Sequence, residues 1–200
     1  MILMMAEKLR DILNRSIFFP IGKRLSFLSP DFITSWAYPL CILAGYFIFI
    51  KDYPLALLFI LLSSVVDNLD GAVAKANNRK TSFGSYFDAF TDRIQEFFIL
   101  LGFALSGYAV EAFFAISASF MVSYAKARAE MIKPLGNMDW PSIGERAERL
   151  VIVMLFMLIA IFYPRFQDYS VIGIGLWVLT AVAAIGTMQR FFFAKKILSK

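Results

Sequence analysis

Four aspartates within a 26-residue stretch are the residues of this chain best suited to chemistry. Asp67 and Asp70 are three residues apart and Asp88 and Asp92 are four apart, so each pair falls on one stripe of an α-helix. Carboxylates at such close range repel one another unless a cation lies between them. The chain has no histidine and one cysteine, so the available ligands are hard oxygens, which favour Mg²⁺, Mn²⁺ or Ca²⁺ over zinc or copper.

The surroundings of these aspartates predict a substrate that contains phosphate. Four carboxylates can hold two cations, and a two-metal site binds a phosphate oxygen while it stabilises the leaving group. Small residues on the same stripes leave room for a bulky ligand, although they also serve close helix packing. These small residues are Gly71, Ala74 and Gly84. Cations suited to phosphate follow the first pair at Lys75, Arg79 and Lys80, so we predict a phosphoanhydride.

The elements that must position these residues are membrane helices. With 60% hydrophobic residues and a mean hydropathy of +0.68, the chain is far more apolar than a soluble domain. Only the first and last of its uncharged runs approach the roughly 20 residues that cross a bilayer unaided, so the others must include polar residues at their ends. The runs cover residues 32–50, 53–66, 97–110, 112–125, 150–163 and 169–189.

The predicted fold is an all-α integral membrane protein with six transmembrane helices, preceded by an amphipathic interfacial helix. We expect one domain over residues 1–200. Residues 1–28 would form the amphipathic juxtamembrane segment, broken near Pro20 to Gly22, and residues 29–200 a six-helix bundle. The juxtamembrane segment is expected to contact anionic membrane lipids. The two aspartate pairs would then come from adjacent antiparallel helices.

The placement of charge predicts the orientation in the membrane. With six spans and a cytoplasmic N-terminus, Lys51 and Arg165 are the only two of the 20 basic residues that lie outside. We therefore expect a multi-pass protein of the cell membrane, with both termini and the aspartates on the cytoplasmic side.

Eight positions around the aspartates resemble a known signature. They are Asp67, Asp70, Gly71, Ala74, Lys75, Gly84, Asp88 and Asp92. Their spacing, D-x2-D-G-x2-A-K-x8-G-x3-D-x3-D, is similar to that of the CDP-alcohol phosphatidyltransferase family, which usually has Arg at the fifth position. Lys75 keeps the charge of that residue but lacks its planar guanidinium.

The resemblance implies a metal-dependent transferase with two Mg²⁺ (or Mn²⁺) ions as cofactors. An alcohol attacks the lipid-side phosphorus of a CDP-lipid, and CMP leaves. The implied metal ligands are Asp67, Asp70, Asp88 and Asp92, and Asp92 is also the implied general base. The implied CDP-lipid-binding positions are Asp67, Asp70, Gly71, Ala74, Lys75 and Gly84. The family further implies a homodimer, and we expect no nucleic acid partner.

A second group of basic residues predicts the acceptor. Cations next to a metal site favour an acceptor that is itself a phosphate, and five basic residues lie at cytoplasmic helix ends: Lys126, Arg128, Arg146, Arg149 and Arg190. Anchoring by the positive-inside bias is the alternative. The stretches S-Y-x-K-A-R-A-E and G-x-x-E-R resemble the phosphatidylinositol phosphate synthase branch of the family and its archaeal archaetidylinositol phosphate counterpart. The acceptor-binding positions that this resemblance implies are Lys126, Arg146 and Arg190.

That second resemblance implies a specific reaction. The phospholipid moiety of CDP-archaeol or CDP-diacylglycerol would be transferred to the hydroxyl of myo-inositol phosphate, giving archaetidylinositol (or phosphatidylinositol) phosphate and CMP. The alternatives are glycerol phosphate as acceptor, CDP-inositol as donor, and a cation transporter built from intramembrane carboxylates. Against the transporter, the acidic residues gather toward one membrane face, and no acidic group near the outer ends completes a path.

Overall fold

The computed structural model describes residues 18–79, 81–134, 140 and 143–199. Most of the predicted amphipathic segment 1–28 lies outside the described residues, as does Lys80. Backbone contacts divide the chain into two compact units, each made of two stretches of sequence. Unit 1 comprises Met1–Ala44 and Leu58–Phe98, and unit 2 comprises Gly45–Leu57 and Ile99–Lys200. The single domain over residues 1–200 stays a prediction.

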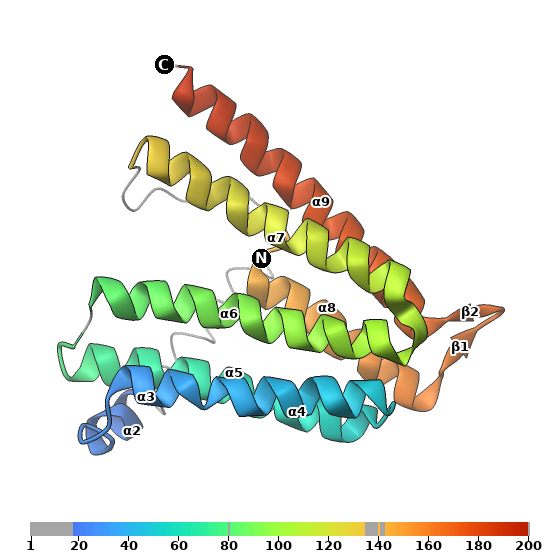
Figure 1. The fold of residues 1–200 in the computed structure, drawn as a ribbon, viewed down its shortest axis with the longest axis horizontal. Helices are drawn as coiled ribbons and strands as arrows, with labels where there is room; N and C mark the ends of the chain where they lie inside the picture. The colour runs from blue at the N-terminus through green and yellow to red at the C-terminus, as the bar shows by residue number, and fades with distance from the viewer. Residues whose placement is uncertain (1–17, 80, 135–139, 141–142, 200) are drawn as a thin grey trace. The chain divides into compact units, whose positions relative to one another are not determined.

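The described chain is built from helices, which Figure 1 labels. In chain order they are α2 (Phe19–Arg24), α3 (Pro30–Ser35), α4 (Ala37–Phe49), α5 (Tyr53–Ala76), α6 (Ser82–Phe103), the π-helix η2 (Ala104–Tyr108), α7 (Ala109–Ile132), α8 (Arg146–Phe162) and α9 (Val171–Leu198). Between α8 and α9, strands β1 (Arg165–Phe166) and β2 (Tyr169–Ser170) pair antiparallel. The hydropathy pattern does not predict this short hairpin.

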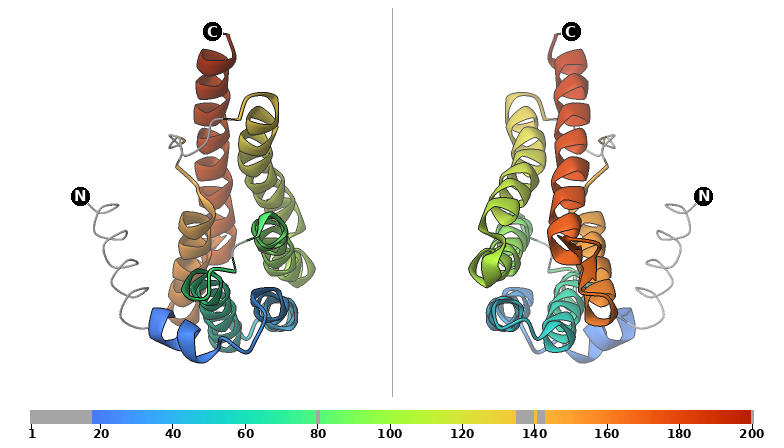
Figure 2. Two further views of the ribbon diagram at one scale, coloured as in Figure 1. Left: turned by 90° about the vertical axis from the view of Figure 1, so that its left-hand side faces the viewer. Right: turned by 90° about the vertical axis from the view of Figure 1, so that its right-hand side faces the viewer.

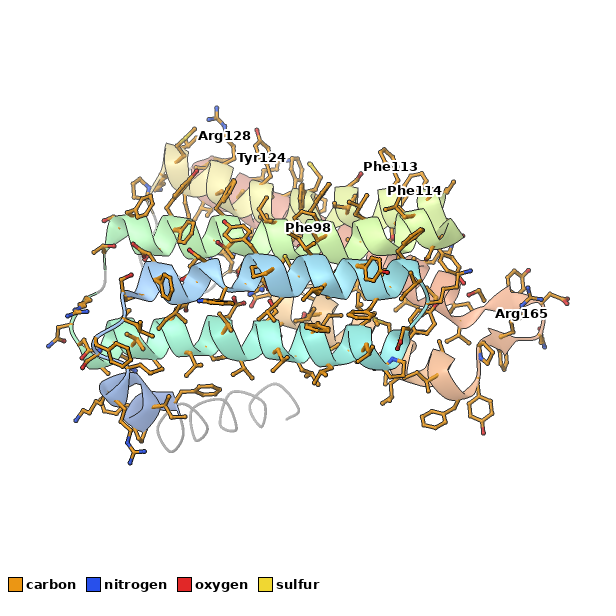
Figure 3. The ribbon with its side chains drawn as sticks, turned by 60° about the horizontal axis from the view of Figure 1, so that its bottom comes forward. Phe98, Phe113, Phe114, Tyr124, Arg128 and Arg165 are labelled. Atoms are coloured by element: carbon orange, nitrogen blue, oxygen red, sulfur yellow. The ribbon has the colours of Figure 1, made fainter. Side chains whose placement is uncertain are left out.

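Four helical stretches of the described chain are long and apolar enough to cross a membrane: Pro30–Phe49, Tyr53–Ala76, Ser82–Ile132 and Val171–Leu198. Large apolar side chains lie exposed on them, as expected for surfaces that contact lipid. Figure 3 shows Phe113 and Phe114 projecting from one part of α7, and Tyr124 and Arg128 from another. The chain is therefore a membrane-embedded helical protein.

In unit 1, capping residues determine where the helices of the predicted site begin. The Oγ of Ser29 accepts a hydrogen bond from Phe32 N at 3.2 Å, and Pro30 lies in the first turn, so α3 begins there. Thr81 Oγ1 accepts from Gly84 N at 2.8 Å and caps α6 in the same way. A turn at residues 77–78 follows α5 ahead of this cap.

Helix α2 corrects one prediction. It runs through Pro20 and Gly22, where the sequence predicted a break, because a proline in the first turn removes only an N–H that has no helical partner. Gly22 packs directly on α5: a Cβ at this position would lie 2.9 Å from the carbonyl carbon and oxygen of Ala72. Asn77 Nδ2 also donates to Gly22 O at 3.3 Å. Helix α2 is thereby held against the C-terminal part of α5.

In unit 2, α9 packs along α7 and also against α8, as Figure 2 shows. Buried apolar side chains from the three helices form its core, among them Ala112, Ala115, Met157, Leu176, Leu179 and Ala183. Gly107, with a φ of 111°, interrupts the helical backbone inside η2. The 51-residue stretch Ser82–Ile132 is therefore two successive helices, α6 and α7, with a break between them.

Candidate functional site

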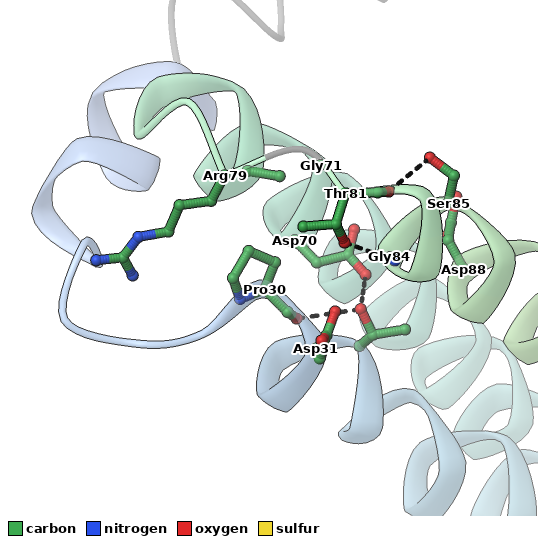
Figure 4. A pocket seen from close by; sticks show the side chains of 11 residues that line it. Pro30, Asp31, Asp70, Gly71, Arg79, Thr81, Gly84, Ser85 and Asp88 are labelled. Atoms are coloured by element: carbon green, nitrogen blue, oxygen red, sulfur yellow. Dashed lines mark hydrogen bonds between the residues drawn. The ribbon is translucent and has the colours of Figure 1, made fainter.

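A pocket of about 240 Å³ opens in unit 1, where α3, the C-terminal part of α5 and the first turns of α6 meet (Figure 4). Its lining includes five of the eight signature positions, which come from two helices. They are Asp70, Gly71 and Ala74 from α5, and Gly84 and Asp88 from α6. The structure thus brings most of the signature to one place.

The other three signature residues do not line this pocket. Asp67 lies one turn earlier on α5, and its Oδ1 accepts a hydrogen bond from Gln95 Nε2 at 2.8 Å. Asp92 lies one turn after Asp88 on α6, with Oδ2 3.7 Å from Nη1 of the neighbouring Arg93. Lys75 lies in the last turn of α5. The binding and catalytic roles of these three residues stay predictions.

The buried carboxylate of Asp70 is held by a neutral partner. Thr34 Oγ1 lies 2.5 Å from Asp70 Oδ2 and 3.1 Å from Pro30 O. A hydroxyl has a single proton and a carboxylate is the stronger acceptor, so we assign that proton to the bond with Asp70. Thr34 therefore orients Asp70 without adding a positive charge beside it.

The contribution of α3 to this pocket was missed in the sequence. Pro30, Asp31 and Thr34 all line it, and Asp31 supplies a third carboxylate. The spacing of Asp31 and Thr34 places both on one face at the start of an apolar run, which is the signal that could have identified them. The connector contributes as well, through Thr81.

Arg79 lines the pocket but does not present its guanidinium to it. Its Nη1 donates to the carbonyl of Ser26 at 3.0 Å and to that of Leu28 at 3.5 Å. Figure 4 shows the guanidinium at the loop between α2 and α3, away from Asp70. Arg79 therefore tethers this loop, whereas the sequence predicted a cation for phosphate.

The oxygen ligands of the pocket suit a hard divalent cation. Among the described residues, no three His, Cys, Asp or Glu side chains already lie close enough together to hold a metal ion. Asp31, Asp70 and Asp88 nevertheless reach one pocket from three different helices. Carboxylate oxygens are the ligands that Mg²⁺ and Mn²⁺ prefer, so the residues fit such an ion by ligand type.

The predicted acceptor residues lie in unit 2, around Arg190. This arginine of α9 is 6% exposed and donates from Nη1 to Val122 O of α7 at 2.7 Å. Its Nη2 lies 3.3 Å from Oε1 of Glu145, the N-cap residue of α8, and Arg146 is the next residue. Lys126 follows Val122 by one turn of α7. Arg190 thus connects the two segments that carry the other predicted cations.

Comparison with known proteins identifies related chains. A family model for CDP-alcohol phosphatidyltransferase matches residues 27–190. The archaetidylinositol phosphate synthase of Pyrococcus horikoshii is 31% identical over 180 residues, which cover 88% of this chain and 89% of that protein.

Two crystal structures of a Mycobacterium tuberculosis phosphatidylinositol phosphate synthase share the fold. The complex with manganese and citrate is 25% identical with a TM-score of 0.76, over 89% of this chain and 88% of that one. The complex with CDP-DAG is 24% identical with a TM-score of 0.77, over 89% and 93%.

Proposed function

The chain belongs to the CDP-alcohol phosphatidyltransferase family, and from this premise we propose that it transfers the phospholipid moiety of a CDP-lipid to the hydroxyl of myo-inositol phosphate. The products would be archaetidylinositol phosphate or phosphatidylinositol phosphate, together with CMP. The observation that carries the proposal is the pocket of unit 1, where signature residues from α5 and α6 meet. The similarity to an archaetidylinositol phosphate synthase over most of the chain supports inositol phosphate as acceptor and CDP-archaeol as donor.

In the proposed reaction, the acceptor hydroxyl oxygen attacks the lipid-side phosphorus of the diphosphate. A new P–O bond forms, the bond from this phosphorus to the bridging oxygen breaks, and CMP leaves with that oxygen. Asp92 takes the hydroxyl proton as general base. Two Mg²⁺ or Mn²⁺ ions held by Asp67, Asp70, Asp88 and Asp92 would supply the positive charge that stabilises the diphosphate and the leaving group. The manganese complex of the mycobacterial relative supports this use of a divalent ion.

Each substrate is assigned to one of the two groups of residues. The CDP-lipid is assigned to Gly71, Ala74, Lys75 and Gly84 with the α5 aspartates. Gly71 supports this assignment, since a Cβ added there would meet no atom within 4 Å, so the residue faces open space in the pocket. The acceptor phosphate is assigned to Lys126, Arg146 and Arg190. Burial of the Arg190 guanidinium strengthens its attraction for an anion.

We extend the proposal to the membrane topology: six crossings, with both termini and the pocket on the cytoplasmic side. The break at Gly107 supports separate crossings by α6 and α7. Helix α8 has 17 residues, which is the lower limit for a transmembrane helix. At 1.5 Å per residue it is about 26 Å long. Lys51 lies in the turn between α4 and α5, and Arg165 in the hairpin between α8 and α9, as the positive-inside bias requires. We also propose a homodimer, which crosslinking in native membranes would test.

The test of the reaction is a CMP-release assay with purified protein in lipid nanodiscs. CDP-archaeol or CDP-diacylglycerol is supplied with Mg²⁺ and one of three acceptors: myo-inositol phosphate, glycerol 3-phosphate or serine. We expect CMP and a lipid inositol phosphate, identified by mass spectrometry, with the first acceptor only. Turnover with glycerol 3-phosphate but not with inositol phosphate would overturn the acceptor assignment. The relative rates with the two CDP-lipids identify the donor.

A further inference from the structure

Gln95 links the two helices that carry the aspartates of unit 1. It lies on α6, three residues after Asp92, and is only 4% exposed. Its Nε2 donates to Asp67 Oδ1 at 2.8 Å, and its Oε1 accepts from Ser63 Oγ at 2.9 Å. Ser63, 3% exposed, lies one turn before Asp67 on α5. A chain of hydrogen bonds therefore runs from the buried Ser63 and Gln95 to the half-buried Asp67.

The direction of this chain follows from the groups in it. A carboxylate only accepts hydrogen bonds, whereas an amide has a donor nitrogen and an acceptor oxygen. Gln95 must therefore turn its nitrogen toward Asp67. The Ser63 hydroxyl donates to the amide oxygen and so disfavours the flipped orientation, in which that oxygen would face the carboxylate. Two neutral side chains thus hold a charged one in place.

We propose that Gln95 and Ser63 are positioning residues for cation binding by Asp67. The amide holds Asp67 in one orientation before the cation arrives, and because it is neutral it leaves the negative charge of the carboxylate intact. A lysine or arginine in its place would orient Asp67 equally well but would compete with the cation. The inference rests on the assignment of Asp67 as a metal ligand in the proposed function. Partners that orient a metal ligand typically change metal affinity by about 10–100-fold.

The competing explanation is that the chain of hydrogen bonds only joins α5 to α6. A structural role of this kind would lower the thermal stability when the bonds are removed, but it would not change the affinity for a cation in protein that remains folded. Metal affinity measured without substrate therefore separates the two roles.

The test is a Mn²⁺ titration of the purified full-length protein, with free Mn²⁺ followed by its electron paramagnetic resonance signal. Gln95→Met keeps the length of the side chain but removes both hydrogen bonds, and we expect its Mn²⁺ affinity to fall about 10–100-fold. Ser63→Ala should weaken Mn²⁺ binding by a smaller factor, because the amide then loses one of its two hydrogen bonds but still donates to Asp67. Ser64→Ala is the matched control, since the Ser64 hydroxyl bonds only the Ile60 carbonyl among its described partners, at 3.0 Å. We expect no change there.

Two results would contradict the assignment, and they are distinguishable. Unchanged Mn²⁺ affinity in folded Gln95→Met would overturn the positioning role while leaving the proposed function intact. If Gln95→Met does not fold, unchanged affinity in Ser63→Ala overturns the positioning role in the same way. Wild-type protein that binds no Mn²⁺ and turns over without a divalent ion would instead overturn the metal assignment of the proposed function.

Discussion

The two units of the molecule hold buried charges of opposite sign with the same kind of partner. In unit 1, two carboxylates accept hydrogen bonds from neutral side chains. Asp70 accepts from the Thr34 hydroxyl and Asp67 accepts from the Gln95 amide. A hydroxyl or amide donor satisfies a carboxylate oxygen without itself adding a positive charge.

In unit 2 the charges are guanidiniums, and main-chain carbonyls hold them. Arg149 Nη1 donates to Gly144 O at 2.6 Å, and Arg190 Nη1 donates to Val122 O at 2.7 Å. The carbonyls orient these cations without adding a full negative charge, and Glu145 Oε1 also lies 3.3 Å from Arg190 Nη2. The contrast agrees in sign with the proposed function, which assigns the cations to carboxylates of unit 1 and the acceptor phosphate to basic residues of unit 2.

The largest effect should come from removing the general base in unit 1. Asp92→Asn keeps the size of the side chain but cannot accept the hydroxyl proton, so we expect kcat to fall by about 10²–10⁴. The CMP-release assay measures this loss. Size-exclusion chromatography and thermal melting should match those of the wild type. A kcat near the wild-type value would remove Asp92 from the mechanism.

Removing a cation from unit 2 should weaken binding of the acceptor but not of the CDP-lipid. Arg190→Met deletes a buried cation that the proposed function assigns to the acceptor phosphate. A charge-assisted hydrogen bond to that phosphate is worth about 1.5–3 kcal/mol, so we expect the KM for inositol phosphate to rise about 10–100-fold. The KM for the CDP-lipid should not change. Arg165→Met, in the exposed hairpin, is the matched control. An equal rise in both KM values would show that unit 2 does not separate the two substrates.

Several features of unit 1 could be predicted from the sequence. Helix starts at Ser29 and Thr81 were predictable because caps are local, and the spacings of three and four that place each aspartate pair on one stripe of its helix are local as well. Gln95 and Thr34 were not predictable as partners, because each is an ordinary polar residue in its own helix. Their roles arise only when two helices pack together.

The same reasoning explains where the sequence was misleading. Arg79 has the charge and position of a phosphate ligand, yet its guanidinium bonds the carbonyls of Ser26 and Leu28, far away in sequence. Pro20 and Gly22 are typical helix breakers, but the first suits a first turn and the second lets α2 approach α5. For Arg79 and Gly22 the deciding contact is tertiary, and no local pattern reports it.

Substitutions at two glycines of unit 1 should have effects of intermediate size. One tests the packing of two helices, and the other tests the space available to the ligand. In Gly22→Ala the new Cβ would meet the Ala72 carbonyl at 2.9 Å, so we expect a loss of about 1–3 kcal/mol in the free energy of unfolding. Gly71→Ala meets no atom within 4 Å and should keep its stability while it weakens CDP-lipid binding. Thermal melting and the CDP-lipid KM measure the two changes. A destabilised Gly71→Ala would contradict its assignment to the ligand.

The smallest effect should come from Glu145, a carboxylate paired with Arg190. Its side chain is 57% exposed whereas that of Arg190 is 7% exposed, so solvent screens the pair and the energy lies near 0.2–1 kcal/mol. Glu145→Gln keeps an oxygen to cap α8 but removes the charge, so the KM for the anionic acceptor should fall by no more than about 5-fold, and less at high salt. Glu111→Gln on α7 serves as control. A rise in the KM for the acceptor would instead mean that Glu145 positions the Arg190 guanidinium. Unit 2 would then depend on a charged partner.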